Sequence, residues 1–236
     1  MLKEAQAVLA RLEAGLKTVR SVAVGERSEL HVGYAPSPTA RLLPAALRAF
    51  QAEFPNVRVR LHDMTTEEMI VGVREEKLQV ALGVRPATAM LRGLQFTALS
   101  CEAMRLAVAP NHPLARRREV TLPLIAREPL ITYSRSDYPE YHAFIISLFA
   151  PLKVRPRIVE EHDGIMSLIA GVEAGGGVAL VSRSVSCMAG LRLKLLPIKP
   201  VLRPLKIGAI RLASGSAPAA EQFVQCAQKV AAELEE

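Results

Sequence analysis

The chain has 236 residues, half of them hydrophobic, and a formal net charge of +7. That length suffices for one large domain or two small ones with a well-buried core. No stretch is long and apolar enough to predict a membrane-spanning helix, and the N-terminal segment lacks the cleavage site of a secretory signal. The three cysteines are far apart and show no CxxC spacing, which indicates a reducing, cytoplasmic setting without disulfides.

The basic residues are spread along the chain rather than gathered in one place. The one dense run, Arg116 to Arg118, follows a His-Pro turn and has no aromatic residues interleaved with it. Nucleic-acid-binding surfaces combine clustered positive charge with such features. A solvated loop is the better interpretation of this run.

Residues 1–25 predict a separate helix. Its apolar residues alternate at spacings of three and four, the pattern of a heptad seam that packs against a second helix: Leu2, Ala5, Leu9, Leu12, Leu16 and Val19. We interpret this segment as a linker and dimerisation helix, which predicts a homodimer or homotetramer. The alternative is an amphipathic helix packed on its own domain.

The next segment predicts alternating strands and helices. A short strand starts at Glu29, and a helix follows whose apolar residues share one face: Leu43, Leu47, Phe50 and Phe54. Residues 57–61 alternate as a second strand. Thr65-Thr66-Glu67-Glu68 then fits a capping box that opens a second helix. Residues 80–84 are continuously apolar, as expected of a strand inside a parallel sheet.

The same order returns in the second half. Residues 130–133 predict a strand, residues 134–141 a polar loop, and residues 157–160 a further strand, after which Asp163 is expected to cap a helix. The glycine triplet 175–177 follows this helix and precedes a buried strand. A phosphate-binding loop has the reverse order, so we interpret the triplet as a helix end and tight turn.

The repeat predicts an α/β fold of two Rossmann-like lobes joined by two crossover strands. Residues 29–99 and 203–236 would form lobe I, and residues 100–202 lobe II. Ligands of open α/β sheets bind outside the carboxyl ends of the strands. Both polar loops lie there, and hydroxyls at helix starts (Ser37 and Thr39, then Thr65 and Thr66) favour a small anion or carboxylate. The pattern points to sensing rather than catalysis.

Several segments, taken in order, resemble the effector-binding domain of LysR-type transcriptional regulators. They are Val-Gly-Tyr-Ala-Pro-Ser at 32–37, Phe-Pro-Asn-Val at 54–57, Asp-Met-Thr-Thr at 63–66, Leu-Gln-Val-Ala-Leu-Gly-Val at 78–84, Ala-Pro-Asn-His-Pro-Leu-Ala at 109–115 and Val-Glu-Ala-Gly-Gly-Gly-Val-Ala-Leu-Val at 172–181. The resemblance covers residues 29–236 and implies a fold like that of type II periplasmic binding proteins. The nearest likeness is to members that respond to aromatic acids. Family members read DNA through a winged helix-turn-helix, which this chain does not include.

The resemblance implies a small-molecule effector bound between the lobes. By position, Ser37 and Thr66 match the hydroxyls that hold an effector carboxylate, while Pro139, Glu140 and Tyr141 match a loop that closes over the ligand. Two further candidates are Ser134 at the strand edge and Ser100 at the hinge. No cofactor, metal or catalytic residue is expected. The helix 43–54 is a candidate dimer surface by the same likeness.

The tyrosines bear on the class of effector. The chain has only four, and all fall in or beside the two loops predicted to face the cleft: Tyr34, Tyr133, Tyr138 and Tyr141. This favours an aromatic or ring-derived ligand. Members that bind ring-cleaved diacids resemble this chain except for arginines where it has Val84 and Ser100, so a monocarboxylate or neutral ligand is the better expectation.

Two other classes of protein remain open. A transporter's solute-binding protein shares the two-lobe plan, but it would need a signal peptide or lipid anchor and would be monomeric. An enzyme would need a catalytic constellation, and the only candidate pair is His142 beside Glu140. We interpret both as surface polar residues.

Overall fold

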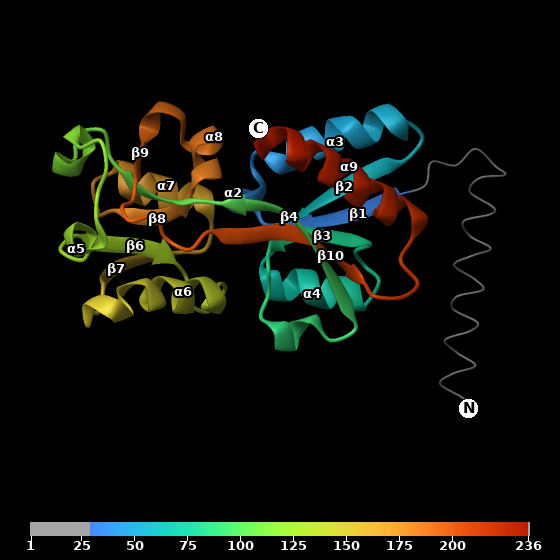
Figure 1. The fold of residues 1–236 in the computed structure, drawn as a ribbon, viewed down its shortest axis with the longest axis horizontal. Helices are drawn as coiled ribbons and strands as arrows, with labels where there is room; N and C mark the ends of the chain where they lie inside the picture. The colour runs from blue at the N-terminus through green and yellow to red at the C-terminus, as the bar shows by residue number, and fades with distance from the viewer. Residues whose placement is uncertain (1–28, 236) are drawn as a thin grey trace.

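The computed structural model describes residues 29–235 and contains two lobes that lie side by side (Figure 1). The linker helix predicted at residues 1–25 lies outside the described residues. Among the helices of residues 29–235, none has the length and hydropathy needed to cross a lipid bilayer.

Lobe I is built on a five-stranded sheet. Its first three strands are parallel, and the fourth runs antiparallel to both of its neighbours. The order across the sheet is β2 (Arg58–Asp63), β1 (Glu29–Tyr34), β3 (Val80–Val84), β10 (Leu205–Leu212) and β4 (Leu94–Glu102). Helices α3 (Leu42–Glu53) and α9 (Pro218–Glu235) cover one face, and α4 (Thr66–Arg74) covers the other (Figure 1).

The predicted helices of lobe I form for the expected reasons. The side chain of Phe50 on α3 is fully buried and meets Phe223 of α9 edge to face, with ring centroids 5.4 Å apart. The start of α4 is the predicted capping box: the Thr65 hydroxyl accepts from the Glu68 amide at 3.3 Å, and the Glu68 carboxylate accepts from the Thr65 amide at 2.8 Å. A separate four-residue helix, α2 (Pro36–Thr39), precedes α3.

Lobe II repeats the plan with two smaller sheets. The three-stranded sheet has the order β8 (Ala179–Ser182), β5 (Met104–Val108), β9 (Lys194–Pro197), and β6 (Pro129–Tyr133) pairs in parallel with β7 (Arg157–His162). A bridge between Leu130 and Val178 connects the two sheets. Helix α6 (Pro139–Phe149) packs on one side of these strands and α7 (Ile165–Glu173) on the other. Short helices of lobe II are α5 (Leu122–Ile125), α8 (Ser186–Ala189) and the 3₁₀ turns Pro113–Arg116, Ala150–Leu152, Arg183–Val185 and Gly190–Arg192, while the 3₁₀ turn Thr88–Leu91 belongs to lobe I.

Of the two predictions for the ends of helix α7, the one for its start is wrong and the one for its end is confirmed. Asp163 does not cap α7: the N-cap residue is Gly164, and the Asp163 carboxylate instead accepts from the Ser167 hydroxyl at 3.0 Å. The glycine triplet does end this helix. A Cβ on Gly177 would lie 2.5 Å from the Pro129 carbonyl oxygen, so the return to the sheet requires glycine there.

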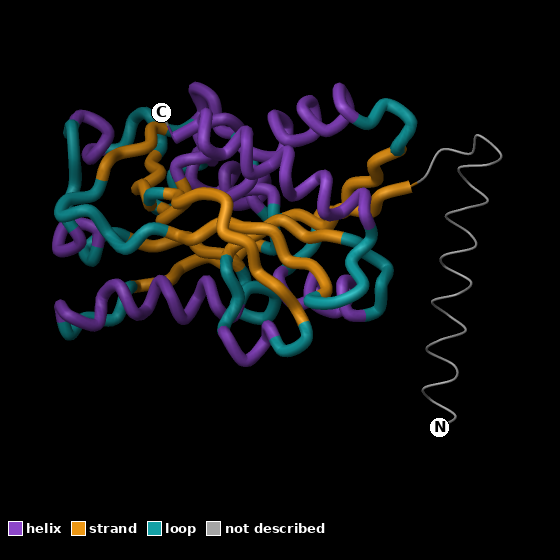
Figure 2. The backbone as a smooth tube through the Cα atoms, turned by 45° about the vertical axis from the view of Figure 1, so that its right-hand side comes forward, coloured by secondary structure: helices purple, strands orange, loops and turns teal. Residues whose placement is uncertain are grey.

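The chain crosses between the lobes twice. Strand β4 passes into β5 through Ala103, and β9 passes into β10 through residues 198–204. In Figure 2 the strands run through the middle of the molecule, with helices above and below them. The expected fold class, two α/β lobes joined by two crossovers, is therefore confirmed.

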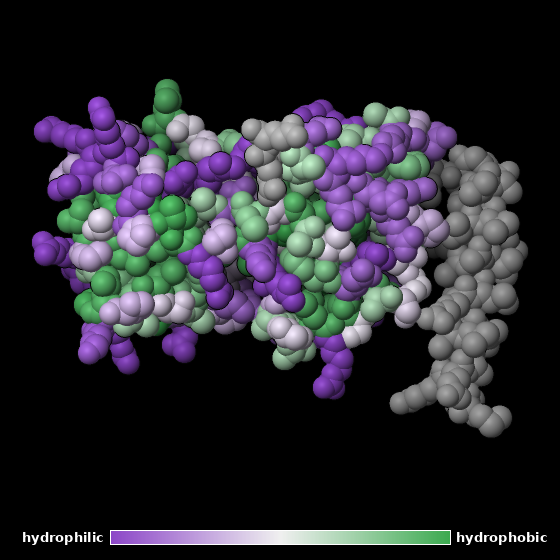
Figure 3. All heavy atoms as spheres, in the orientation of Figure 1, coloured by the Kyte–Doolittle hydropathy of each residue, from purple (hydrophilic) through white to green (hydrophobic). Residues whose placement is uncertain are grey.

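Hydrophilic side chains project from the end of lobe II that faces away from lobe I (Figure 3). Arg116, Arg117 and Arg118 are all exposed, as predicted for a solvated run.

Candidate functional site

A cavity of about 850 Å³ lies between the lobes, where the carboxyl ends of strands from the two lobes meet. Lobe I supplies the residues that follow β1, β2 and β3, and lobe II supplies those that follow β6, β7 and β8. The second crossing closes one side. Its lining includes residues 35–38, 63–66, 84–88, 163–165 and 203–206, together with Glu68, Tyr133, Tyr138, Glu140, Tyr141, Phe144 and Ser182.

The lobe I wall carries the hydroxyls predicted from sequence, in unequal settings. Thr66 is the first residue of α4 and its side chain makes no hydrogen bond within the described residues, so its hydroxyl is open to a ligand beside the capped N-terminus of a nine-residue helix. Thr65 is used by the capping box. Ser37 lies on the four-residue helix α2, which is too short to contribute an appreciable dipole.

Ser37 is also where the lobes touch. The Ser182 hydroxyl of lobe II donates to the Ser37 carbonyl oxygen at 3.0 Å. The Tyr133 hydroxyl faces the Ser37 side chain, whose hydroxyl partly offsets the raised pKa that burial gives to Tyr133. Ser37 therefore lines the cavity and joins the lobes at the same time.

The lobe II wall is a cluster of tyrosines. The Tyr133 ring lies 5.0 Å from that of Tyr138 and 4.9 Å, edge to face, from that of Tyr141. The Tyr141 hydroxyl donates to the Leu180 carbonyl oxygen, and burial raises its pKa well above the ordinary value. The Tyr138 hydroxyl donates to the Asp163 carbonyl oxygen at 3.3 Å. The Tyr138 and Tyr141 hydroxyls are thus engaged within the protein, and this wall offers ring faces and the Tyr133 hydroxyl to a ligand.

The loop expected to close over the ligand is different in the structure. Pro139, Glu140 and Tyr141 form the first turn of α6, because proline is well suited to the first position of a helix. Glu140 and Tyr141 line the cavity, whereas Pro139 is not among the lining residues.

Two of the predicted site residues, Ser134 and Ser100, lie outside the lining of the cavity. Ser134 is bound to its neighbour Ser136 at 2.7 Å between hydroxyl oxygens, and Ser100 lies in β4 opposite Ile207. Neither is among the lining residues, while Ser37, Thr66, Glu140 and Tyr141 are brought together.

Charged residues of both signs line the cavity. The cations lie on the β3 and hinge side, where the Arg85 guanidinium stacks 5.4 Å from the centre of the Phe96 ring. Partial burial raises the pKa of the Asp63 carboxyl, and the nearby Glu68 adds to this effect. The lining cations are Arg85, Arg203 and Lys206, and the lining acids are Asp63, Glu68, Glu140 and Asp163.

The lining residues that sequence reasoning missed as site candidates include Asp63, Ser182 and Lys206. Asp63 had a usable signal, because it ends a strand of a parallel sheet and therefore lies at the ligand-binding edge. Ser182 and Lys206 depend on how the two lobes meet, which local patterns do not encode.

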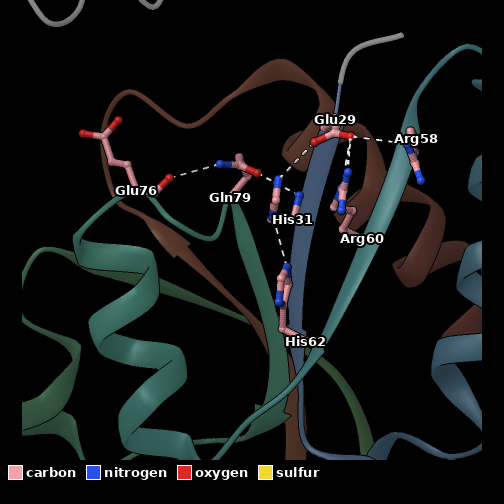
Figure 4. A network of polar contacts seen from close by, with 7 residues as sticks. All are labelled: Glu29, His31, Arg58, Arg60, His62, Glu76 and Gln79. Carbon is pink, nitrogen blue, oxygen red and sulfur yellow. Dashed lines mark hydrogen bonds and ion pairs between the residues drawn. The ribbon is translucent and has the colours of Figure 1, made fainter.

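A second polar cluster lies on lobe I but does not line the cavity (Figure 4). The His31 and His62 rings stack with Nδ1 and Nε2 3.0 Å apart, Glu29 accepts from the Arg60 side chain at 3.0 Å, and the Gln79 side chain accepts from the His31 amide at 2.8 Å. These bonds tie β1 to β2 and to the start of β3. Among residues 29–235, no group of three or more His, Cys, Asp or Glu side chains could hold a metal ion.

The family described as the LysR substrate binding domain matches residues 23–232. The chain belongs to this family. It is 27% identical over 226 residues to the HTH-type transcriptional regulator TtuA of Agrobacterium vitis, covering 94% of this chain and 74% of that protein. It is 26% identical to AlsR of Bacillus subtilis, covering 78% of this chain and 60% of AlsR.

Solved structures of LysR proteins share the fold. The LysR family transcriptional regulator CbnR superimposes with a TM-score of 0.78 at 24% identity, over 98% of this chain and 79% of CbnR. The effector-binding domain of BenM with its effector benzoate gives a TM-score of 0.77 at 20% identity, over 88% of this chain and 94% of that domain. The effector-binding domain of QuiR in complex with shikimate gives 0.77 at 20% identity, over 88% of this chain and 98% of that domain.

Proposed function

We propose that this LysR substrate-binding domain senses a small carboxylate effector in the cavity between its lobes. The observation that carries the proposal is the composition of the cavity, in which the free hydroxyl of Thr66 at a helix N-terminus opposes the aromatic wall of Tyr133 and Tyr138. A helix N-terminus favours negative charge, and ring faces favour an apolar body.

The expected ligand is an aromatic or ring-derived monocarboxylate. Benzoate and shikimate, the ligands named for BenM and QuiR, are both ring-bearing monocarboxylates. Ser37 and Thr66 would hold the carboxylate, while Glu140 and Tyr141 would border the ring. Pro139, Ser134 and Ser100 do not line the cavity, so they would affect ligand binding only by positioning adjacent residues.

Ligand binding would favour one arrangement of the lobes over another. A ligand can shift such an equilibrium only by the difference in its affinity for the two states. The Ser182–Ser37 hydrogen bond is one contact that such a shift would change. Residues 29–99 with 203–236, and residues 100–202, would be the two moving lobes.

In the full regulator we propose that this movement controls transcription from DNA in the cytoplasm. DNA would be bound by a winged helix-turn-helix, and residues 1–25 with the helix 43–54 would join copies into a homodimer or homotetramer. We propose no enzymatic role. Glu140 lines the cavity without His142, so the one candidate catalytic pair is not assembled there.

The proposal is tested by calorimetric titration of carboxylic acids against the chain and three variants. Removing the hydroxyl in Ser37→Ala or Thr66→Val should weaken binding about tenfold or more, the value of a hydrogen bond to a charged group. Thr121→Val, which changes a threonine that does not line the cavity, should have no effect. Equal affinity in all four proteins would contradict the proposal. Native mass spectrometry would add the oligomeric state, since a monomer would favour the solute-binding alternative.

A further inference from the structure

Asp63 is an unpaired carboxylate inside the proposed effector cavity. It is the last residue of β2, opposite Tyr34 of β1, at the carboxyl edge of the lobe I sheet. Its side chain is exposed, lines the cavity and makes no hydrogen bond or ion pair within residues 29–235. Two of the other lining acids are engaged, since Glu68 binds Thr65 and Asp163 binds Ser167, whereas Glu140 on the lobe II side makes no such bond within residues 29–235.

The surroundings of Asp63 are phenols rather than cations. Its negative charge contributes to the raised pKa values of Tyr34, Tyr133 and Tyr138, which places it among these rings. Although Arg203 and Lys206 line the same cavity, neither forms an ion pair with Asp63. The carboxylate therefore faces the cavity without a neutralising partner.

A second feature of the same cavity points to a polar ligand. The Tyr133 residue is 7% exposed, and its hydroxyl oxygen is buried without a hydrogen bond of normal geometry in the described residues. It lines the cavity and faces Ser37. A buried polar group left without a partner costs free energy, which a ligand atom of matching polarity would recover.

A plain carboxylic acid suits this wall poorly. It would exclude water from Asp63 and add a negative charge beside a carboxylate that has no ion-pair partner, and both effects oppose binding. A ligand that also carries an N–H or O–H donor would give Asp63 the partner that the protein does not supply. The ligands that suit this cavity thus share a carboxylate and a hydrogen-bond donor, either N–H or O–H.

We propose that Asp63 selects carboxylate effectors that also carry an ammonium or hydroxyl group, and discriminates against plain carboxylic acids. This inference rests on the proposed function of the cavity. Glu140, on the opposite wall, is also exposed and acidic, and it strengthens the preference for a donor.

The test is a calorimetric comparison of two matched series against the whole chain. One series is benzoate, 4-hydroxybenzoate and 4-(aminomethyl)benzoate, and the other is butyrate, 4-hydroxybutyrate and 4-aminobutyrate. In the wild-type protein at least one donor-bearing acid should bind about tenfold more tightly than its parent. An advantage confined to the amino acids would identify an ammonium ligand, and one confined to the hydroxy acids a hydroxyl ligand.

The Asp63→Asn variant should abolish the advantage and leave the parent acids bound equally or more tightly. Glu67→Gln, which removes an exposed charge from α4 outside the cavity, should keep the advantage. Parent acids that bind as tightly as their derivatives, or an advantage that survives in Asp63→Asn, would overturn the inference and leave the proposed function intact. If no acid of either series binds, both the inference and the proposed function are overturned.

Discussion

Replacing Tyr141 with phenylalanine separates a structural role from a ligand-binding role. The substitution removes one oxygen atom and keeps the ring. The ring packs against Tyr133 and contacts the hydrophobic cores on both sides of the lobe II strands. In the structure that oxygen donates to the Leu180 carbonyl of β8. We therefore expect Tyr141→Phe to destabilise the protein and to leave effector affinity within about twofold of wild type.

The magnitude follows from what is lost. A hydrogen bond between neutral groups contributes about 1 kcal/mol net, and a buried carbonyl left without its partner raises the loss towards about 3 kcal/mol. We expect about 1–2 kcal/mol, because the ring contacts remain. For a chain of this size, each kcal/mol lowers the melting temperature by about 2–4 °C.

Urea denaturation followed by circular dichroism measures the loss directly, and calorimetry measures effector affinity. Tyr138→Phe is the matched control, since its hydroxyl makes an exposed 3.3 Å hydrogen bond to the Asp163 carbonyl, and it should cost less than about 0.5 kcal/mol. Unchanged stability together with weaker effector binding in Tyr141→Phe would refute the reasoning. That result would mean the hydroxyl turns towards the ligand.

Three further predictions follow from local contacts. Thr65→Ala should lower the free energy of unfolding by about 1 kcal/mol because it removes the cap of α4, while Thr66→Ala should change it little; urea denaturation compares them. Burial raises the pKa of Tyr133 and Tyr141 above about 10, their value in the unfolded chain. Their contribution to stability is therefore complete below about pH 10 and is lost as the pH rises through the pKa values of the folded protein. Melting temperatures measured up to alkaline pH should fall less steeply in Tyr141→Phe. Ser182→Ala removes the hydrogen bond to the Ser37 carbonyl and should widen the lobe separation measured by small-angle X-ray scattering; an unchanged profile would show that other contacts hold the lobes.

The elements that depend on short sequence patterns could be predicted. The apolar spacing around Phe50 gives a helix on which Leu43 and Phe50 are buried as predicted, while Leu47 is half-buried and Phe54 lies just past the helix end. Thr65 with Glu68 forms the predicted capping box. Ser37 and Thr66 reach the cavity because residues that follow parallel strands share one edge of the sheet.

What could not be predicted depends on contacts between distant segments. The direction of the Tyr141 hydroxyl is set by β8, which lies far away in the sequence. The start of α6 at Pro139 brings Glu140 inward and leaves Pro139 out of the cavity, a difference of one residue that periodicity does not resolve. The position of Asp63 at the end of a strand could be predicted, whereas the arrangement of the tyrosines around it depends on how the two lobes meet.

The cavity is built unequally from its two lobes. On lobe I the polar wall, including Ser37, Asp63 and Thr66, stands outside the hydrophobic clusters. On lobe II the aromatic wall belongs to the core itself, since Tyr133 is one of the buried residues of its cluster. Substitutions in the lobe I wall that change effector preference should therefore have little effect on folding stability. Substitutions in the lobe II wall should also destabilise the domain.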